Sequence, residues 1–195
     1  MKKHNGLALC LSLVFSFLLA SCNYSFIQKP AESSSSNPVN NQPASKPDAI
    51  HQWAVSAKAS SQYSDPNWAA SQAIGEPDVF VCGDNIKAWA AEKEDSIEWI
   101  DLDYSTPVIP SEINIYQNYK PSQVTEVALF TPNGKKYIAW EGYPEKVKNC
   151  PDLMTVTVNL DKKVAVNKIR VTLDQRVNGW GWNEIDAVEL VGTNP

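Results

Sequence analysis

Short segments of alternating apolar and polar residues constrain the fold of this chain more than any other feature of its sequence. Each segment is five to nine residues long and is separated from the next by turn residues such as Thr131-Pro-Asn-Gly134. Alternation of this kind is typical of strands with one buried face, and eight of them with little helix between predict an antiparallel β-sandwich. The predicted strands cover residues 53–58, 96–104, 112–117, 124–130, 136–140, 155–160, 167–173 and 184–191.

The last of these segments also indicates where a site lies. Trp180 and Trp182 lie in a short loop with Gly179 and Gly181, and Glu184 follows where the loop becomes a strand. We expect the strand to be buried on one side only, and the aromatic loop before it to lie at one end of the sandwich. Loops that are held by a rigid sheet are where binding residues concentrate.

The direction of the strands predicts which loops share that end. If each strand crosses the sandwich once, the loops alternate between two ends, and the long ones all fall together. This set holds most of the loop aromatic residues, so we expect the function there. The long loops are 59–95, 118–123, 141–152 and 174–183.

The start of the chain carries an export signal. Two lysines precede an apolar run, Leu7–Ala20, that is too short to span a bilayer comfortably, as in a secretory signal peptide. The run ends Leu19-Ala-Ser-Cys22, which resembles the lipobox of bacterial lipoproteins. The resemblance implies a signal peptide over 1–21 and acyl chains on Cys22. Asn23 at the next position favours the outer membrane. The alternative is an ordinary signal peptide that a cysteine happens to follow.

Residues 22–49 are rich in serine, proline and asparagine and poor in apolar side chains. Such a segment buries too little surface to offset its loss of conformational entropy, so we expect a disordered tether. The folded domain is predicted over 50–193. No internal repeat is present.

Charge narrows the class of partner. The chain carries 22 acidic and 17 basic residues, a net charge of −5, and removing the signal and tether leaves 20 against 13. An acidic domain argues against nucleic acid and against anionic lipid head groups, which need a basic face.

Two cysteines, Cys82 and Cys150, fall in the predicted domain. In an exported protein we expect them to form a disulfide, and they lie in loops of the same predicted end. Two free thiols or a metal site are the alternative.

Several motifs together resemble the discoidin-like, galactose-binding-like superfamily, and the similarity runs from about Trp53 to Gly192. The resemblance implies an eight-stranded jelly roll that acts as a binding module, often for glycans. The motifs are Ala59-Ser-Ser-Gln-Tyr63, Trp68-Ala-Ala-Ser-Gln-Ala-Ile-Gly-Glu-Pro-Asp78, Gly83-Asp-Asn85 with Ala88-Trp89, Ile97-Glu-Trp-Ile-Asp-Leu102 and Gly181-Trp-Asn-Glu-Ile-Asp-Ala-Val-Glu-Leu190.

The same resemblance implies a structural Ca²⁺ held by Asp78, Asp84, Asn85 and Glu184, whose oxygen atoms suit that ion. The chain departs from the family's common Asp-Gly-x-x-x-Thr-x-Trp pattern, because its looser form ends Lys87-Ala-Trp89 and lacks the hydroxyl. The alternative is that Asp78 and Asp84 cap turns while Glu184 pairs with a lysine.

Aromatic faces stack on the C–H groups of sugars, so Trp180 and Trp182 are the first candidates for a carbohydrate ligand. Tyr119, Arg176 and Asn178 lie in the same set of loops and would add polar contacts. The alternative is that one tryptophan of the pair closes the end of the sandwich. Trp68 and Trp89 are interpreted as packing residues.

No catalytic motif is recognisable. The predicted domain has a single histidine, His51, and no nucleophile elbow, phosphate loop or zinc motif. Acid pairs such as Asp101 and Asp103 have no partner that would make them catalytic. We therefore expect a membrane-tethered, non-catalytic binding domain, with a carbohydrate as the first ligand. The alternative is a structural or assembly lipoprotein that contacts an envelope protein.

Overall fold

The computed structural model describes residues 48–179 and 181–195. Within these ranges the chain forms eight strands and one short 3₁₀ helix, η1. Of the described residues, none belongs to a helix long and apolar enough to cross a membrane. The elements are β1 (Ile50–Trp53), β2 (Ser56–Ala59), η1 (Ala70–Ala73), β3 (Ile97–Tyr119), β4 (Val124–Phe130), β5 (Lys136–Glu141), β6 (Asp152–Thr157), β7 (Val166–Asp174) and β8 (Glu184–Thr193).

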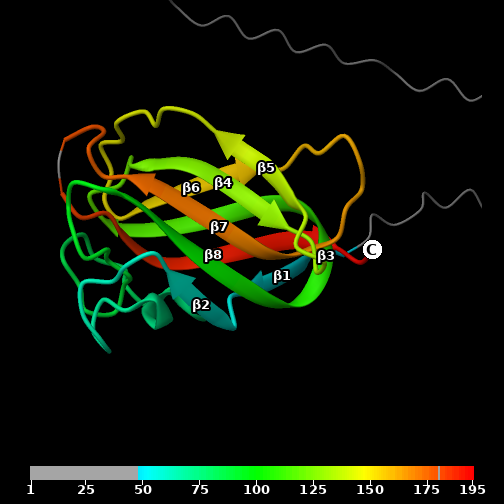
Figure 1. Ribbon diagram of the computed structural model, residues 1–195, viewed down its shortest axis with the longest axis horizontal. Helices are drawn as coiled ribbons and strands as arrows, with labels where there is room; N and C mark the ends of the chain where they lie inside the picture. Colours follow the sequence, from blue (N-terminus) through cyan, green and yellow to red (C-terminus); the bar gives the residue numbers. More distant parts are fainter. Residues whose placement is uncertain (1–47, 180) are drawn as a thin grey trace, which may run out of the picture. The chain divides into compact units, whose positions relative to one another are not determined.

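All strand pairs are antiparallel, and the strands form two layers that share β3 (Figure 1). One layer has the order β1-β8-β3-β6 and the other β2-β3-β7-β4-β5. The first half of β3 pairs with β2 and β7, and its second half pairs with β6 and β8. The predicted eight-stranded antiparallel jelly roll is confirmed.

The prediction of a loop over 105–111 is wrong, because β3 bends from one layer into the other without ending. Tyr104 and Val108 are buried on either side of the bend, and the Tyr104 hydroxyl donates to the carbonyl of Val188 at 3.0 Å. Pro110 pairs with Gly192 on β8. A Cβ at Gly192 would lie 2.5 Å from the Ile109 carbonyl oxygen, so only glycine lets the two strands approach this closely.

The core lies between the layers and follows the predicted alternation. Ile100, Leu102, Ile113 and Ile115 on β3 are fully buried, as their positions in the pattern indicate. They meet apolar residues of β4, β7 and β8 in one continuous cluster. Burying such side chains stabilises the fold by about 1.5–3 kcal/mol each.

The strand β8 departs from the prediction that only one of its sides is buried. Ile185, Ala187, Val188 and Leu190 are all fully buried, although they point to both faces. The reason is the loop after β2, which folds back over the start of β8. Trp89 pairs with Ile185 through two backbone hydrogen bonds of 2.9 and 3.1 Å.

The four long loops meet at one end of the sandwich, on the left in Figure 1. The amide of Gly83 donates to the carbonyl of Asn118 at 3.0 Å, which joins the first loop to the second. The predicted disulfide between Cys82 and Cys150 is confirmed and joins the first loop to the third. The prediction of the shared end therefore holds, because the bend in β3 reverses the chain as the expected loop would have done.

Candidate functional site

Two acids at the start of β8 hold the loop that follows β2. The Asp186 carboxylate accepts hydrogen bonds from the backbone amides of Asp78 and Val79, at 3.3 and 3.1 Å. Glu184 Oε2 accepts from the amide of Asn85 at 3.0 Å and from Asn118 Nδ2 at 2.6 Å. These bonds are what bring the loop's aromatic and acidic side chains to the end of the sandwich.

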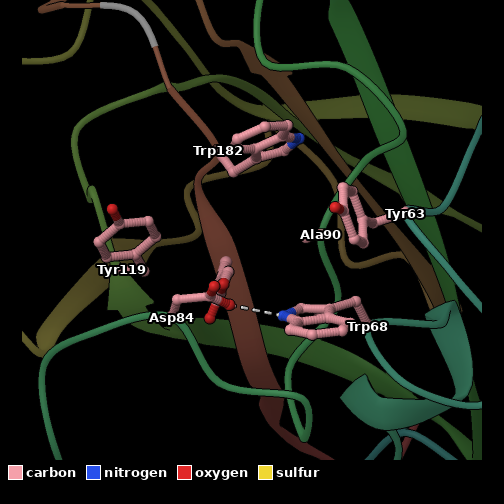
Figure 2. Close-up of a pocket in the computed structure, with 7 residues that line it drawn as sticks. Tyr63, Trp68, Asp84, Ala90, Tyr119 and Trp182 are labelled. Atoms are coloured by element: carbon pink, nitrogen blue, oxygen red, sulfur yellow. Dashed lines mark hydrogen bonds between the residues drawn. The ribbon is translucent and has the colours of Figure 1, made fainter.

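A pocket of about 160 Å³ lies where this loop meets β3 and the loop before β8. Four of its lining residues are aromatic and two are acidic (Figure 2). Typical small-molecule sites measure about 300–1,000 Å³, so this pocket suits one end of a ligand. It is lined by Tyr63, Trp68, Asp84, Ala90, Tyr119, Trp182 and Glu184.

Three of the pocket's aromatic side chains pack edge to face. The Tyr63 ring lies 5.3 Å from Trp68 and 5.6 Å from Trp182, with interplanar angles of 74° and 82°. Tyr63 is 52 % exposed, so the cluster is open to solvent. The indole nitrogen of Trp182 is buried and has no hydrogen-bond partner among the described residues.

The two acids of the pocket lie together. Trp68 Nε1 donates to Asp84 Oδ1 at 2.8 Å, which places Asp84 between Trp68 and Tyr119 in Figure 2. Glu184 is only 1 % exposed. Burial, with a smaller contribution from the like-charged Asp84, raises the pKa of Glu184 to about 8.

The structure brings together two of the five residues predicted to bind a ligand. Tyr119 and Trp182 line the pocket. Arg176 lies apart and forms an ion pair with Asp174, with Nε 2.8 Å from Oδ1. Trp180 lies outside the described residues, so the prediction for it is untested.

The fifth residue, Asn178, ties loops to one another. Its side-chain amide donates to the carbonyls of Ser122 and Pro144, at 3.0 and 2.7 Å. It also lines a second groove of about 370 Å³, which shares Tyr119 with the pocket and contains the disulfide and Lys120, Lys146 and Lys148.

Sequence reasoning missed Tyr63 and misinterpreted Trp68. Trp89 is a packing residue as predicted, since it is fully buried and its indole nitrogen donates to the Ser61 carbonyl at 3.0 Å. Trp68 is half-buried and lines the pocket instead. The available signal was an aromatic pair, Tyr63 and Trp68, in a polar loop with no strand pattern.

The four residues predicted to hold Ca²⁺ do not converge. Asp78 forms an ion pair of 2.8 Å with Lys87, and Asn85 Oδ1 accepts from the Lys87 amide. Only Asp84 and Glu184 meet, and two N–H donors already contact the Glu184 carboxylate. Within the described ranges, no group of three or more His, Cys, Asp or Glu side chains is placed to hold a metal. The four side chains are therefore not gathered around one point, and a Ca²⁺ ion held with the help of backbone carbonyls stays a prediction.

The acid pair on β3 has structural partners. Asp101 forms a bidentate ion pair with Arg170, with Oδ2 2.7 Å from a guanidinium nitrogen. Asp103 pairs with Lys168 at 3.2 Å and accepts from the Ser56 hydroxyl. Both acids lie on the layer that contains β2 and β7, and neither lines the pocket.

The fold is an eight-stranded jelly-roll β-sandwich whose long loops meet at one end, as the sequence resemblance implies. The profile of the pappalysin-1 family, SD scarf domain, C-terminal, matches residues 42–195. The chain belongs to that family. No curated protein matches it by sequence.

Solved structures support the same fold. The family 32 CBM of NanJ from C. perfringens, in complex with galactose, is 19 % identical, with a TM-score of 0.52 over 73 % of this chain and 99 % of that one. CpGH89CBM32-5 of Clostridium perfringens, in complex with GalNAc-β-1,3-galactose, is 14 % identical, with a TM-score of 0.52 over 71 % and 94 %. Chitosan-binding module 1 of a chitosanase/glucanase from Paenibacillus sp. IK-5 is 14 % identical, with a TM-score of 0.51 over 69 % and 92 %.

Proposed function

We propose that this protein is a non-catalytic carbohydrate-binding module and that its ligand occupies the pocket beside Trp182. The observation that carries the proposal is the set of four aromatic rings gathered around a small solvent-open pocket. Rings of this kind stack on the apolar faces of sugars, and nearby polar groups fix the orientation of the hydroxyls. The size of the pocket favours a single terminal sugar ring.

The solved structures of similar fold support this proposal by what their titles state of their own ligands. They name galactose, a disaccharide of GalNAc and galactose, and chitosan. At identities of 19 % or less they support a sugar as a class of ligand and leave its identity open.

Binding to a glycan array followed by isothermal titration tests the proposal with the full-length protein. Trp182→Ala removes one wall of the pocket and should weaken binding of the best glycan by about tenfold, since a stacking contact contributes about 0.5–1.5 kcal/mol beyond the area it buries. Trp53→Ala is the matched control, because Trp53 packs on Tyr116 away from the pocket. Equal loss in both variants, or no glycan binding at all, would contradict the proposal.

We also propose that the domain is exported and held at a bacterial membrane, with the outer membrane favoured, by acyl chains on Cys22. Several acyl chains make a durable anchor, because each buried CH₂ contributes about 0.8 kcal/mol. Cys22→Ala should move the protein from the membrane fraction to the soluble fraction while leaving sugar binding unchanged. A variant that remains with the membrane refutes the anchor.

The second candidate is a structural lipoprotein that contacts an envelope protein. The observation in its favour is a set of exposed apolar side chains beside the disulfide: Phe80 is 75 %, Val81 66 % and Leu153 48 % exposed. Silence on the array, together with a specific envelope protein that is retained by the wild type and lost with Phe80→Ser, would favour this function instead.

A further inference from the structure

The pocket beside Trp182 carries negative charge among aromatic rings. Asp84 and Glu184 both line it, although Glu184, whose pKa is raised to about 8, adds its charge only at alkaline pH. No lysine or arginine is among the described lining residues. The loop between β2 and β3, residues 60–96, supplies one wall. It holds seven acidic residues against two lysines, a local net charge of −5. A concave site with charge of one sign attracts ligands of the other sign.

The N–H donors of the protein reach one oxygen of each carboxyl group. In the described part of the chain, the N–H donors that reach Asp84 and Glu184 bond to Oδ1 and Oε2 respectively. The second oxygen of each group receives no N–H bond among those contacts, and the two carboxyl groups hydrogen-bond to each other. A ligand that carries several N–H donors would complete the arrangement, whereas a neutral hydroxyl would compensate little of the negative charge.

The aromatic rings favour the same kind of ligand. An ammonium group is attracted to the face of a tryptophan or tyrosine within about 6 Å of the ring centroid. The rim already shows such a contact, since the Lys120 ammonium lies 5.7 Å from the centroid of the Tyr119 ring. The rings therefore suit a cation that brings its own apolar surface.

A metal ion suits the pocket less well. Ca²⁺ takes six to eight oxygen ligands at about 2.3–2.6 Å. The pocket offers two carboxyl groups, two tyrosine hydroxyls and otherwise mostly aromatic carbon over about 160 Å³. An organic cation fills such a space, and a bare divalent ion does not.

We propose that the pocket recognises a carbohydrate that carries a free, protonated amine, with the ammonium between the two carboxyl groups and the sugar ring against Trp182. The inference rests on the proposed function and names the class of sugar. The charge of the loop makes binding weaken as salt concentration rises.

Isothermal titration of the full-length protein with three sugars tests this inference. A glucosamine oligomer and the corresponding N-acetylglucosamine oligomer share one ring and differ in the charge of the amine, and a galactose oligomer is the neutral reference. We expect the glucosamine oligomer to bind at least about tenfold more tightly than the other two at low salt. If a neutral oligomer binds equally well or more tightly, the inference of an amine-bearing sugar is wrong and the carbohydrate proposal stands. If none of the three oligomers binds and no glycan on the array binds, both the inference and the proposed function are wrong.

A matched pair of variants locates the charge. Asp84→Asn removes the charge but keeps an oxygen for Trp68 Nε1, so it should lower the affinity for the glucosamine oligomer about tenfold more than the affinity for the two neutral oligomers. Glu76→Gln removes one charge from an exposed position of the same loop outside the pocket lining and should preserve the preference. An unchanged preference in Asp84→Asn, or equal losses in both variants, contradicts the inference.

Discussion

Aromatic rings and carboxyl groups come together in two regions of this molecule, with different results. On the layer that contains β2 and β7, the guanidinium of Arg170 lies 4.0 Å from the centroid of Trp99 and pairs with Asp101. In the pocket beside Trp182, two acids and four rings meet, and the described lining contains no basic residue. The first region is complete within the protein, whereas we propose that the second takes a cation from a ligand.

A stabilising cluster and a recognition site differ in whether the protein itself supplies the cation that pairs with the acid. A guanidinium that is stacked and doubly hydrogen-bonded is a strong contact that excludes other partners. An acid pair without such a contact raises the free energy of the empty site, and a ligand of opposite charge lowers it. If the two regions differ in this way, changes in one should affect stability and changes in the other should affect ligand binding.

Removing the disulfide, which joins loops only at the pocket end, should change the free energy of unfolding the most. The double variant Cys82→Ser with Cys150→Ser opens a link that spans 68 residues. Loop-closure entropy then predicts a loss of about 4 kcal/mol in the free energy of unfolding. Chemical denaturation measures this loss, and reduction of the wild type provides the control. A loss below about 1 kcal/mol would show that the hydrogen bonds between the loops are sufficient.

A smaller effect should follow the protonation of Glu184. Its pKa is about 8 in the folded protein and near 4.5 when unfolded, so between these values the folded state binds the additional proton. The free energy of unfolding should therefore fall as pH rises from about 5 to 8, by at most a few kcal/mol. Asp186, whose pKa is raised chiefly by burial, acts in the same direction.

Thermal unfolding at several pH values measures this slope. Glu184→Gln should flatten it over the same range, because glutamine does not titrate and keeps an oxygen for the amide of Asn85. A slope that is equally steep in the variant would exclude Glu184 as its source. The amine-bearing sugar should reduce the slope in the wild type, since a bound cation stabilises the ionised carboxylate.

Arg170 on the opposing region should affect stability and leave recognition unchanged. Arg170→Ala leaves Asp101 with little solvent and without its bidentate partner. Because the side chains are partly exposed, we expect a loss of about 2 kcal/mol. Sugar affinity should stay within about twofold of the wild type. A tenfold loss of affinity with normal stability would mean that the two regions are coupled.

The residues that the sequence predicted correctly are those governed by local periodicity. Ile100, Leu102 and Ile113 alternate along their strands, and alternation alone determines which face is buried. The bend in β3 was missed because Pro107 and Pro110 have the composition of a turn. Only the close approach of Gly192 shows that they continue a strand.

The site was predicted less completely because it depends on contacts between distant residues. Trp182 and Tyr119 were found from their places in long loops at the expected end. Trp68 reaches the pocket through its bond to Asp84, sixteen positions away in the sequence, and no local pattern encodes that contact. No local pattern encodes the contacts of Asn178 either. Its polar side chain in a long loop suggested a ligand contact, but its amide joins two other loops.

Added calcium should have the smallest effect on the melting temperature. With Asp78 paired to Lys87, and Asp84 and Glu184 without a third acid, added Ca²⁺ should leave the melting temperature within about 1 °C, as should EDTA. The control is the glucosamine oligomer, which should raise it because a ligand that binds only the folded state stabilises that state. If Ca²⁺ raises the melting temperature and Asp84→Asn abolishes the rise, the carboxyl pair is a metal site and the organic cation is excluded. If only the sugar does so, the acid pair in the pocket serves recognition, as the bidentate Arg170–Asp101 pair serves stability.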